Sequence, residues 1–294
     1  MINKLLLSLL VYIQLQSSVD IIIFSYNRPM QLYACCESIE KYLINYGKVQ
    51  IICRADPDFR TSYSEVEKAF NDFEFIYQGN RPEQDFKTNV MRALSKCGEY
   101  MMFAVDDNIV IDYLDLSECA QALEKYKAYA FLLRLGKNIN FSYMLKKLCP
   151  LPQHTQEDKN ICSYMFRYGS LDWAYPNNVD MTIYRTQNVI AELKKLAFKH
   201  PWSLEGSWTR NANLNLRGLF FNEPRIINLN INLVAKENNS WKFNSEWQKK
   251  YQNYSLNVLL QKFKDGYKID ISKFYKYKIN TVHISSEPDF VKSK

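Results

Sequence analysis

Two acids and an amide, Asp106, Asp107 and Asn108, directly follow a run of apolar residues at 101–105. A short apolar run of this kind predicts a buried strand of a mostly parallel sheet. Its polar end then lies at the sheet edge where open α/β sheets bind ligands. Adjacent carboxylates repel each other unless a cation lies between them or they point in opposite directions. Oxygen ligands suit a hard divalent cation that carries a diphosphate. The alternative is a strand end followed by an Asp/Asn turn.

The segments before these acids alternate between strand and helix patterns. Apolar runs at 19–24, 49–53 and 73–77 predict three further strands, and apolar residues at helical spacing separate them, the last at 83–97. This alternation predicts a doubly wound parallel sheet. The motifs G-x-G-x-x-G and G-x-x-x-x-G-K are absent, which argues against a dinucleotide-dependent oxidoreductase and a P-loop protein.

Polar residues follow the predicted strands in a recognisable order. Ser25-Tyr26-Asn27-Arg28-Pro29 follows the first strand, Asp56 the second, and Asp106-Asp107-Asn108 the fourth. This order and spacing resembles the nucleotide-sugar half of GT-A-fold glycosyltransferases, of the family-2-like kind. The resemblance implies an α/β fold with a mostly parallel central sheet flanked by helices and a mixed acceptor-side half.

The resemblance also implies a donor site and a metal site. Residues after the first two strands would hold the nucleoside of a nucleotide-diphosphate sugar, with a UDP-sugar as the first candidate. The later acids would hold ribose, diphosphate and Mn²⁺ or Mg²⁺. The donor contacts implied in this way are Ser25, Tyr26, Asn27, Arg28, Asp56, Asp106 and Asp107. Asn108 stands where the family motif D-x-D has its second acid, so the choice of metal ligands among Asp106, Asp107 and Asn108 stays open. His283 is a further metal candidate, because many GT-A enzymes use a late His or acid.

An aromatic and acidic stretch at 172–185 suits a sugar site, since rings stack on sugar faces and carboxylates accept hydrogen bonds from hydroxyls. The alternative is a packed Trp with acids in turns. The stretch resembles a bacterial subset of these transferases in which W-x-Y-P precedes an Asp-Gly pair that faces the donor sugar. Trp173 is therefore a predicted donor contact and Asp180 a predicted catalytic residue, with Met181 in place of the Gly.

A glycosyl transfer with inversion needs a carboxylate that takes the proton of the acceptor hydroxyl. Glu205, between Trp202 and Trp208, resembles the acid that family-2-like enzymes place near a helix start, and Asp180 is the rival base. The alternative for Glu205 is a favourable charge in the first turn of a helix capped by Ser203.

Two further strand patterns bear on the site. Arg134 lies inside an apolar strand predicted at 129–135, so it either reaches an acidic partner or points into a site. Asn228, Asn230 and Asn232 alternate with apolar residues, which predicts a strand with one polar face.

Composition limits the partners. The 294 residues include 38 Lys or Arg against 31 Asp or Glu, a net charge of +7. This modest excess suits anionic substrates such as nucleotide diphosphates, or an anionic membrane surface, and is too small and dispersed to indicate nucleic acid. The basic, aromatic stretch at 267–277 could rest on such a membrane. Seven cysteines without a C-x-x-C pair are expected to be reduced core residues.

The predicted organisation has a short N-terminal segment and one domain. Residues 1–18 predict either a signal peptide or an N-terminal helix. Residues 19–294 predict one GT-A-like domain, with a nucleotide-sugar half at 19–112 and an acceptor half with a C-terminal extension at 113–294. The expected location is the cytoplasm or the periphery of the inner membrane, with export left open by residues 1–18.

The function predicted from the resemblance is an inverting, metal-dependent glycosyltransferase that acts on a glycan or lipid-linked acceptor. A nucleotidyltransferase would carry a Gly-rich loop after the first strand, and this chain has Ser25-Tyr26-Asn27-Arg28 there. A phosphatase with Asp106 as nucleophile is a weaker alternative. Asn108 and Met181 depart from the family pattern, which leaves a catalytically degenerate carbohydrate-binding or interaction module as the main alternative.

Overall fold

The structure is a computed structural model that describes residues 17–232 and 252–293. The prediction of a signal peptide or helix at 1–18 lies outside the described residues, apart from Ser17 and Ser18. Within the described ranges, none of the helices has the length and apolar character needed to cross a membrane.

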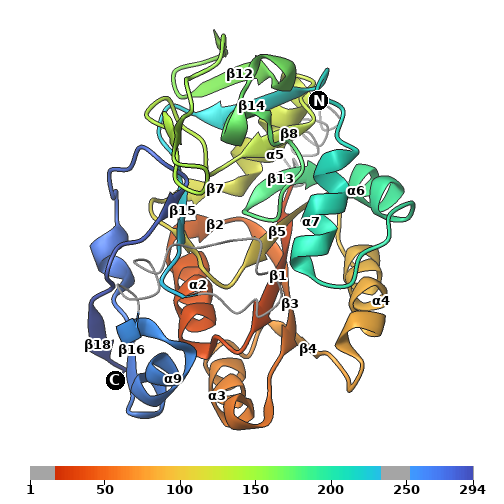
Figure 1. Cartoon of the computed structure of the whole chain (residues 1–294). Helices are drawn as coiled ribbons and strands as arrows, with labels where there is room; N and C mark the ends of the chain where they lie inside the picture. Colours follow the sequence, from red (N-terminus) through yellow and green to blue (C-terminus); the bar gives the residue numbers. More distant parts are fainter. Residues whose placement is uncertain (1–16, 233–251, 294) are drawn as a thin grey trace, which may run out of the picture.

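A nine-stranded sheet forms the centre of the molecule, in the order β11-β12-β14-β8-β13-β5-β1-β3-β4 (Figure 1). The first half is parallel, because β1 pairs in parallel with β3 and β5, and β3 with β4. The second half is mixed, since β13 runs antiparallel to β5 and β8. The predicted α/β fold, with a parallel half and a mixed half, is confirmed. The strand bounds are Val19–Tyr26 (β1), Tyr46–Arg54 (β3), Glu74–Tyr77 (β4), Tyr100–Val105 (β5), Ala130–Leu132 (β8), Thr155–Gln156 (β11), Ile161–Met165 (β12), Thr182–Arg185 (β13) and Arg217–Phe221 (β14).

Helices cover both faces of this sheet (Figure 1). Helices α2, α3 and α9 lie on one side, and α4, α6 and α7 lie on the other. The helix bounds are Pro29–Tyr42 (α2), Arg60–Ala69 (α3), Pro82–Ser95 (α4), Leu116–Lys125 (α5), Thr186–Leu193 (α6), Pro201–Arg210 (α7) and Leu256–Lys264 (α9). Short 3-10 turns occur at Pro57–Phe59, Phe166–Tyr168, Leu171–Ala174, Gln252–Tyr254 and Ile271–Phe274.

The first strand shows why the parallel half forms. Ile21, Ile22 and Ile23 are all fully buried, so consecutive residues of β1 pack against helices on both faces of the sheet. The strand ends where Asn27 adopts φ +54°, a left-handed conformation that Asn tolerates better than most residues. Pro29 then starts α2, where its missing N–H costs no helical hydrogen bond.

A three-stranded sheet lies beyond the carboxyl end of β5 and joins distant parts of the chain. It contains β6 (Asn108–Val110), β15 (Ile226–Leu229) and β17 (His283–Ile284) in the order β17-β15-β6. Asn228 is in register with both Asn108 and His283. Three two-stranded ribbons complete the fold: β2 (Leu43–Ile44) with β7 (Leu114–Asp115), β9 (Phe141–Ser142) with β10 (Lys147–Leu148), and β16 (Tyr267–Ile269) with β18 (Phe290–Lys292).

Helix α7 corrects one prediction. It begins at Pro201, and the ring of His200 accepts a hydrogen bond from the Ser203 N–H, so His200 rather than Ser203 is the N-cap. The Ser203 hydroxyl accepts from the His200 N–H and completes a capping box. Glu205 is consequently past the first turn, where an interaction with the helix dipole has largely faded.

The cysteine prediction is confirmed. All seven cysteines are unpaired, and six are buried, while Cys97 is partly exposed. Burial raises the pKa of the thiols of Cys35 and Cys36 well above the ordinary value, so they stay protonated. They therefore behave as small apolar core residues.

Asp20 links neighbouring strands of the nine-stranded sheet, at the end opposite the three-stranded sheet β17-β15-β6. It is only 5% exposed, and its two carboxylate oxygens accept hydrogen bonds from the N–H groups of Lys48 and Gly98, each at 2.6 Å. Gly47 leaves room for this carboxylate, because a Cβ atom there would lie 2.1 Å from Asp20 Oδ1. The two bonds join β1 to β3 and to the turn before β5.

We expect Asp20→Ala to lower the free energy of unfolding by about 1–3 kcal/mol, since it leaves two N–H groups without an acceptor. Urea unfolding followed by circular dichroism measures this change. Asp72→Ala, which removes an exposed carboxylate, is the control and should be close to neutral. Equal unfolding midpoints for the two variants would contradict the assignment.

Candidate active site

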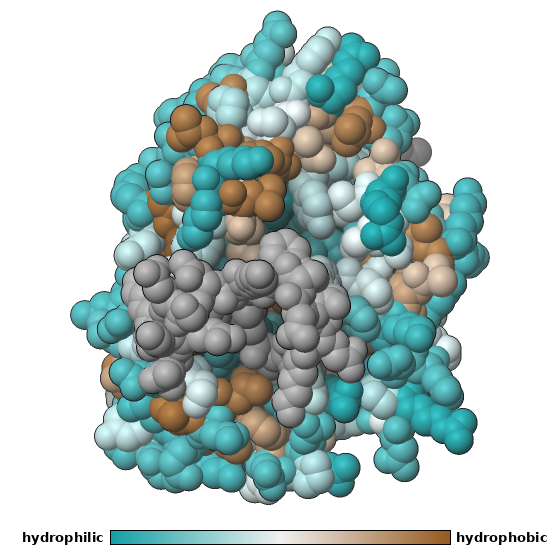
Figure 2. Space-filling model, in the orientation of Figure 1, coloured by the Kyte–Doolittle hydropathy of each residue, from teal (hydrophilic) through white to brown (hydrophobic). Residues whose placement is uncertain are grey.

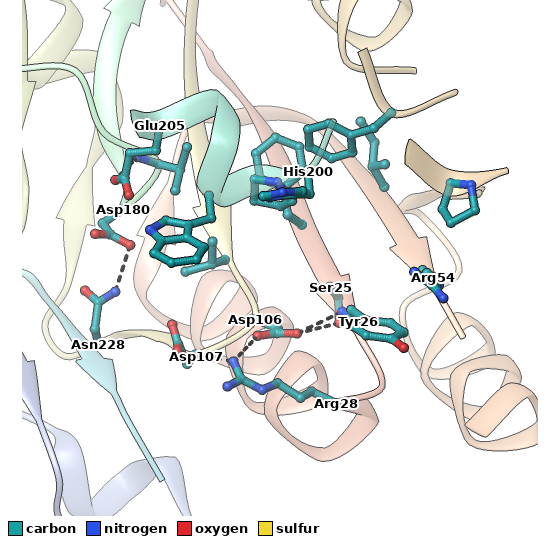
Figure 3. Close-up of a pocket in the computed structure, with 18 of the residues that line it drawn as sticks. Ser25, Tyr26, Arg28, Arg54, Asp106, Asp107, Asp180, His200, Glu205 and Asn228 are labelled. Carbon is teal, nitrogen blue, oxygen red and sulfur yellow. Dashed lines mark hydrogen bonds and ion pairs between the residues drawn. The ribbon is translucent and has the colours of Figure 1, made fainter. Parts of the chain in front are cut away.

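A cavity of about 980 Å³ opens at the carboxyl ends of β1, β3 and β5. The three-stranded sheet β17-β15-β6 and helix α7 line its other side. Charged and polar side chains from both halves of the chain converge on it, as the labelled residues of Figure 3 show. It is therefore built where open α/β sheets bind ligands.

Arg28 and the acid pair occupy the middle of the cavity (Figure 3). Nη1 of Arg28 lies 2.9 Å from Asp106 Oδ1 and 3.3 Å from Asp107 Oδ2. Nη2 of the same guanidinium donates to the backbone oxygen of Asn232 at 2.6 Å. Arg28 is only 7% exposed. The Arg28 guanidinium thus lies between the carboxylates of Asp106 and Asp107 and offsets their mutual repulsion.

Both carboxylate oxygens of Asp106 accept hydrogen bonds. Its Oδ2 accepts from the Ser25 hydroxyl at 2.8 Å and from the Tyr26 N–H at 3.3 Å. Tyr63, which is fully buried, hydrogen-bonds to Ser25 at 2.6 Å and accepts from the Arg28 N–H at 3.1 Å. These contacts fix Asp106 as an anion that organises the end of β1.

Asp107 has an unused oxygen. Its Oδ1 is buried and has no hydrogen-bond partner among the described residues. Burial raises the pKa of Asp107 to about 7, with Arg28 lowering it and Asp106 and Asp180 raising it. This carboxylate is therefore the member of the pair that can take a further ligand.

One end of the cavity is aromatic and polar. The Tyr26 hydroxyl donates to Asp56 Oδ2 at 2.9 Å, and the Arg54 guanidinium lies 4.6 Å from the centroid of the Tyr26 ring. Burial and the hydrogen bond to Asp56 raise the pKa of Tyr26, which keeps its proton. Asn27 donates to Asp56 at 2.8 Å and accepts from the Asp56 N–H at 2.9 Å. This end offers a ring face, a guanidinium and a fixed carboxylate.

The opposite end contains a second set of acids. Asp180 Oδ1 accepts from Asn228 Nδ2 at 2.7 Å, and Asp180 Oδ2 lies 3.4 Å from Arg134 Nη1. Arg134 is 1% exposed, and its Nε and Nη2 have no partner in the described part of the chain. The choice left open for Arg134 is resolved: it pairs with an acid, and that acid lines the cavity.

Glu205 lies beside this pair on α7. Burial and the charge of Asp180 raise its pKa to about 8, while Arg134 opposes the shift. Its Oε1 accepts from the Val179 N–H at 3.2 Å. Glu205 therefore exchanges its proton near neutral pH, which is the range that a general base requires.

Met181, which replaces the Gly of the resembled pattern, adopts φ +47°. This is the left-handed region, which costs a non-Gly residue roughly 1–2 kcal/mol. The Met181 N–H bonds to the Phe103 oxygen at 2.8 Å, and the side chain is fully buried. The turn that carries Asp180 thus has the left-handed backbone conformation that glycine favours, although the residue there is Met181.

The structure brings most of the predicted site residues together. Those that line the cavity are Ser25, Tyr26, Arg28, Asp56, Asp106, Asp107, Asp180, Glu205 and His283. The predicted donor contact Asn27 does not line it, because both polar atoms of its side chain bond to Asp56. Asn27 positions the acid instead of facing a ligand.

Two predictions are corrected. Trp173 is fully buried and packs against Tyr164 and Phe220, and its Nε1–H donates to the Ile139 oxygen at 3.2 Å. It belongs to the core and does not line the cavity. Asn108 is also fully buried, and its Oδ1 accepts from the Val105 N–H at 2.9 Å, so its oxygen faces the chain rather than the cavity.

The predicted metal ligands do not form one cluster. Within residues 17–232 and 252–293, no group of three or more His, Cys, Asp or Glu is placed to hold a metal ion. Burial lowers the pKa of His283, so the ring is neutral, and its Nδ1 is buried with no partner among these residues. Few side-chain atoms are therefore placed to coordinate a cation here, and Asp107 Oδ1 is the carboxylate oxygen among them.

Sequence reasoning did not name Asn228, Asn230, Arg54 or Tyr143 as site residues, yet all four line the cavity. The alternating asparagines carried a usable signal, because one polar face on a buried strand indicates polar surroundings. Arg54 also follows a predicted strand end. Tyr143 carries no such signal.

No protein-family model matches the sequence, and no curated protein matches it either. Among solved structures, TarS 1-349 of S. aureus in complex with UDP has a TM-score of 0.48 at 16% identity, over 71% of this chain and 60% of TarS 1-349. The same protein in complex with UDP-GlcNAc has a TM-score of 0.41 at 17% identity, over 71% and 58%.

A third structure is 4-diphosphocytidyl-2C-methyl-D-erythritol synthase of Anaerococcus prevotii, with a TM-score of 0.37 at 9% identity, over 70% of this chain and 88% of that one. The chain thus matches about 60% of the length of the TarS structure with UDP.

We expect the free energy of unfolding to fall as pH rises from about 4.5 to about 8, in part because of Glu205. Its carboxyl has a pKa of about 8 in the folded chain against an ordinary value of 4.5, so the folded state binds the proton more tightly. Within this window the slope from Glu205 is at most about 1.4 kcal/mol per pH unit.

Urea unfolding at several pH values measures the slope. Glu205→Gln should flatten it, and Glu65→Gln, which alters an exposed side chain, should leave it unchanged. An identical slope in wild type and Glu205→Gln would show that Glu205 is charged throughout this window.

Proposed function

We propose that the chain is a glycosyltransferase that moves a sugar from a nucleotide-diphosphate donor to a hydroxyl group of a glycan or lipid-linked acceptor, with inversion. One observation carries this proposal. A single cavity joins Arg28 and the acid pair to the carboxylates of Asp180 and Glu205 (Figure 3). Its volume of about 980 Å³ lies at the upper end for ligand sites and suits a nucleotide sugar with part of an acceptor.

The nucleoside is assigned to the end formed by Tyr26, Arg54 and Asp56. An aromatic ring offers a face to a base, and a guanidinium adds charge-assisted hydrogen bonds. The Asp56 carboxylate can accept from ring N–H or ribose hydroxyl groups. A uridine diphosphate sugar is the first candidate donor.

The diphosphate is assigned to the middle of the cavity. Arg28 supplies one positive charge there, while Asp106 and Asp107 supply two negative ones, so the local balance is negative before the donor arrives. A diphosphate therefore needs a further cation. Mg²⁺ is commonly held by one or two carboxylates, substrate phosphates and water, and Mn²⁺ suits the same oxygen ligands.

Asp107 Oδ1, which is buried without a partner in the described residues, would hold Mn²⁺ or Mg²⁺ together with the diphosphate. The bound ion would supply charge neutralisation of the leaving diphosphate. Arg28 would bind the phosphate oxygens from the protein side. Asp106 would keep the end of β1 in place through Ser25 and Tyr26.

The acceptor hydroxyl is assigned to the end with Glu205 and Asp180. Arg134 and Asn228 contact the carboxylate of Asp180, whose charge raises the pKa of Glu205. Glu205 would take the hydroxyl proton, with Asp180 as the rival base. Glu205 lies across the cavity from Arg28 (Figure 3), which suits attack on the sugar from the side opposite the diphosphate.

Donor binding is measured by thermal unfolding with UDP-, GDP-, CMP- and dTDP-sugars, with and without Mn²⁺. We expect one nucleotide class to stabilise the protein, by about 2.7 kcal/mol at 100 times its Kd, and more strongly with Mn²⁺. Asp107→Asn should remove the part of the shift that depends on metal, because it removes the available carboxylate oxygen. Asp72→Asn is the surface control. Absence of any shift in the well-folded wild type would refute the donor site.

The pH dependence of transfer tests the base. We expect kcat/KM to rise with pH through about 8, where Glu205 loses its proton. Glu205→Gln should lower kcat by roughly 10²–10⁴-fold. Asp180→Asn should move the rising limb to lower pH, because it removes a negative charge that raises the pKa of Glu205. If Glu205→Gln keeps its activity and Asp180→Asn loses it, the base is Asp180.

A further inference from the structure

A short hairpin forms part of the cavity rim. Its strands are β9 and β10, with Leu148 in register with Phe141, and its turn spans residues 143–146. Tyr143 and Met144 of this turn line the cavity. The segment Phe141–Leu148 is called the rim hairpin below.

The base of the rim hairpin is fixed to the body of the protein. The N–H groups of Asn140 and Phe141 donate to the Asn280 oxygen at 3.0 and 3.1 Å. Cys149, just after the hairpin, is fully buried, and its N–H donates to the Asn140 oxygen at 2.7 Å. The hairpin therefore projects from an anchored base.

The turn and the second strand of the rim hairpin expose apolar and basic side chains. Leu148 is 79% exposed and Leu145 is 49% exposed. Lys146 and Lys147 between them are also exposed. Residues 125–156 contain no Asp or Glu, so no acid in this segment balances the two lysines. Single exposed leucines are ordinary on protein surfaces, but two of them beside two lysines on one projecting hairpin form a distinct surface.

We propose that the rim hairpin docks the protein on an anionic lipid bilayer, with Leu145 and Leu148 entering the headgroup region and Lys146 and Lys147 contacting lipid phosphates. Apolar side chains with adjacent lysines bind such surfaces through buried area and electrostatic attraction. Because Tyr143 and Met144 line the cavity, this docking sets the cavity mouth beside the membrane. The proposal goes beyond the transfer reaction and does not depend on it.

A stretch of similar composition, at 275–277, precedes the segment that anchors the hairpin base. Tyr275 and Tyr277 are each 39% exposed, and the Lys276 ammonium lies 5.3 Å from the centroid of the Tyr275 ring. The chain runs from here to Asn280, which holds the base of the rim hairpin. Tyrosine favours the interface between water and lipid. Figure 2 shows apolar patches bordered by hydrophilic residues on the upper left of the face that it presents.

Co-sedimentation of the full chain with vesicles tests the proposal. The vesicles are phosphatidylcholine alone and phosphatidylcholine mixed with phosphatidylglycerol. We expect binding to the anionic vesicles, weaker binding at higher salt and little binding to the neutral ones. Lys146→Ser with Lys147→Ser should weaken binding by about five-fold for each lysine. Leu145→Ser with Leu148→Ser should weaken it by about ten-fold or more.

The matched control is Val258→Ser with Lys264→Ser, which alters an exposed aliphatic residue and an exposed lysine on α9. It should bind vesicles as the wild type does. All variants should keep the thermal midpoint and the donor-induced stabilisation of the wild type, so a failure here is distinct from a failure of the proposed function.

Two results would overturn the proposal: no binding of the folded wild type to anionic vesicles, or equal binding by the hairpin variants and the control. Polyglutamate added as a competitor separates a lipid surface from a soluble polyanion. If binding depends on the lysines alone and polyglutamate abolishes it, the hairpin recognises a soluble acidic partner and the membrane assignment is wrong.

Discussion

The ion pair between Arg28 and the two carboxylates of Asp106 and Asp107 is the interaction on which the site depends. Two buried carboxylates without a cation would cost several kcal/mol. The sheet supplies the cation because β1 and β5 are parallel neighbours with Phe24 opposite Val105. The residues that follow each strand therefore meet, and the Arg28 guanidinium closes the gap at 2.9 and 3.3 Å.

The same constraint shapes the other end of the cavity. Arg134 and Asn228 stabilise one acid, Asp180, and the half-buried Glu205 lies beside it. Burial and the charge of Asp180 then raise the pKa of Glu205. One arginine compensates the charge of each acid cluster, Arg28 in the middle of the cavity and Arg134 at this end, but each cluster keeps a carboxyl group with a raised pKa, Asp107 or Glu205. These two groups are the ones available for ligand and proton chemistry.

Local sequence patterns predicted the parallel half because its determinants are local: continuous apolar strands, helical spacing, and polar residues at strand ends. The second half of the chain depends on contacts between distant residues. Asn228 reaches Asp180 only because β15 pairs with β6 and with β17. Strand β6 lies more than a hundred residues before β15 in the sequence, and β17 lies about fifty residues after it. Trp173 was misassigned because the sequence pattern of an aromatic residue next to an acid is the same in a sugar site and in a packed core. Asn108 was misassigned because the bond of its Oδ1 to the Val105 N–H is a turn contact that a metal-ligand pattern does not reveal.

Met181 shows that a departure from a sequence pattern need not change the structure. Its φ of +47° keeps the turn that a glycine would make, and the Phe103 oxygen holds that turn against β5. Burial of the Met181 side chain contributes roughly 1.5–3 kcal/mol, enough to offset the left-handed strain. The substitution therefore argues less for a degenerate site than the sequence suggested, since Asp180 still faces the cavity beside Glu205. The backbone conformation that places Asp180 in the cavity is retained through packing rather than through the residue type.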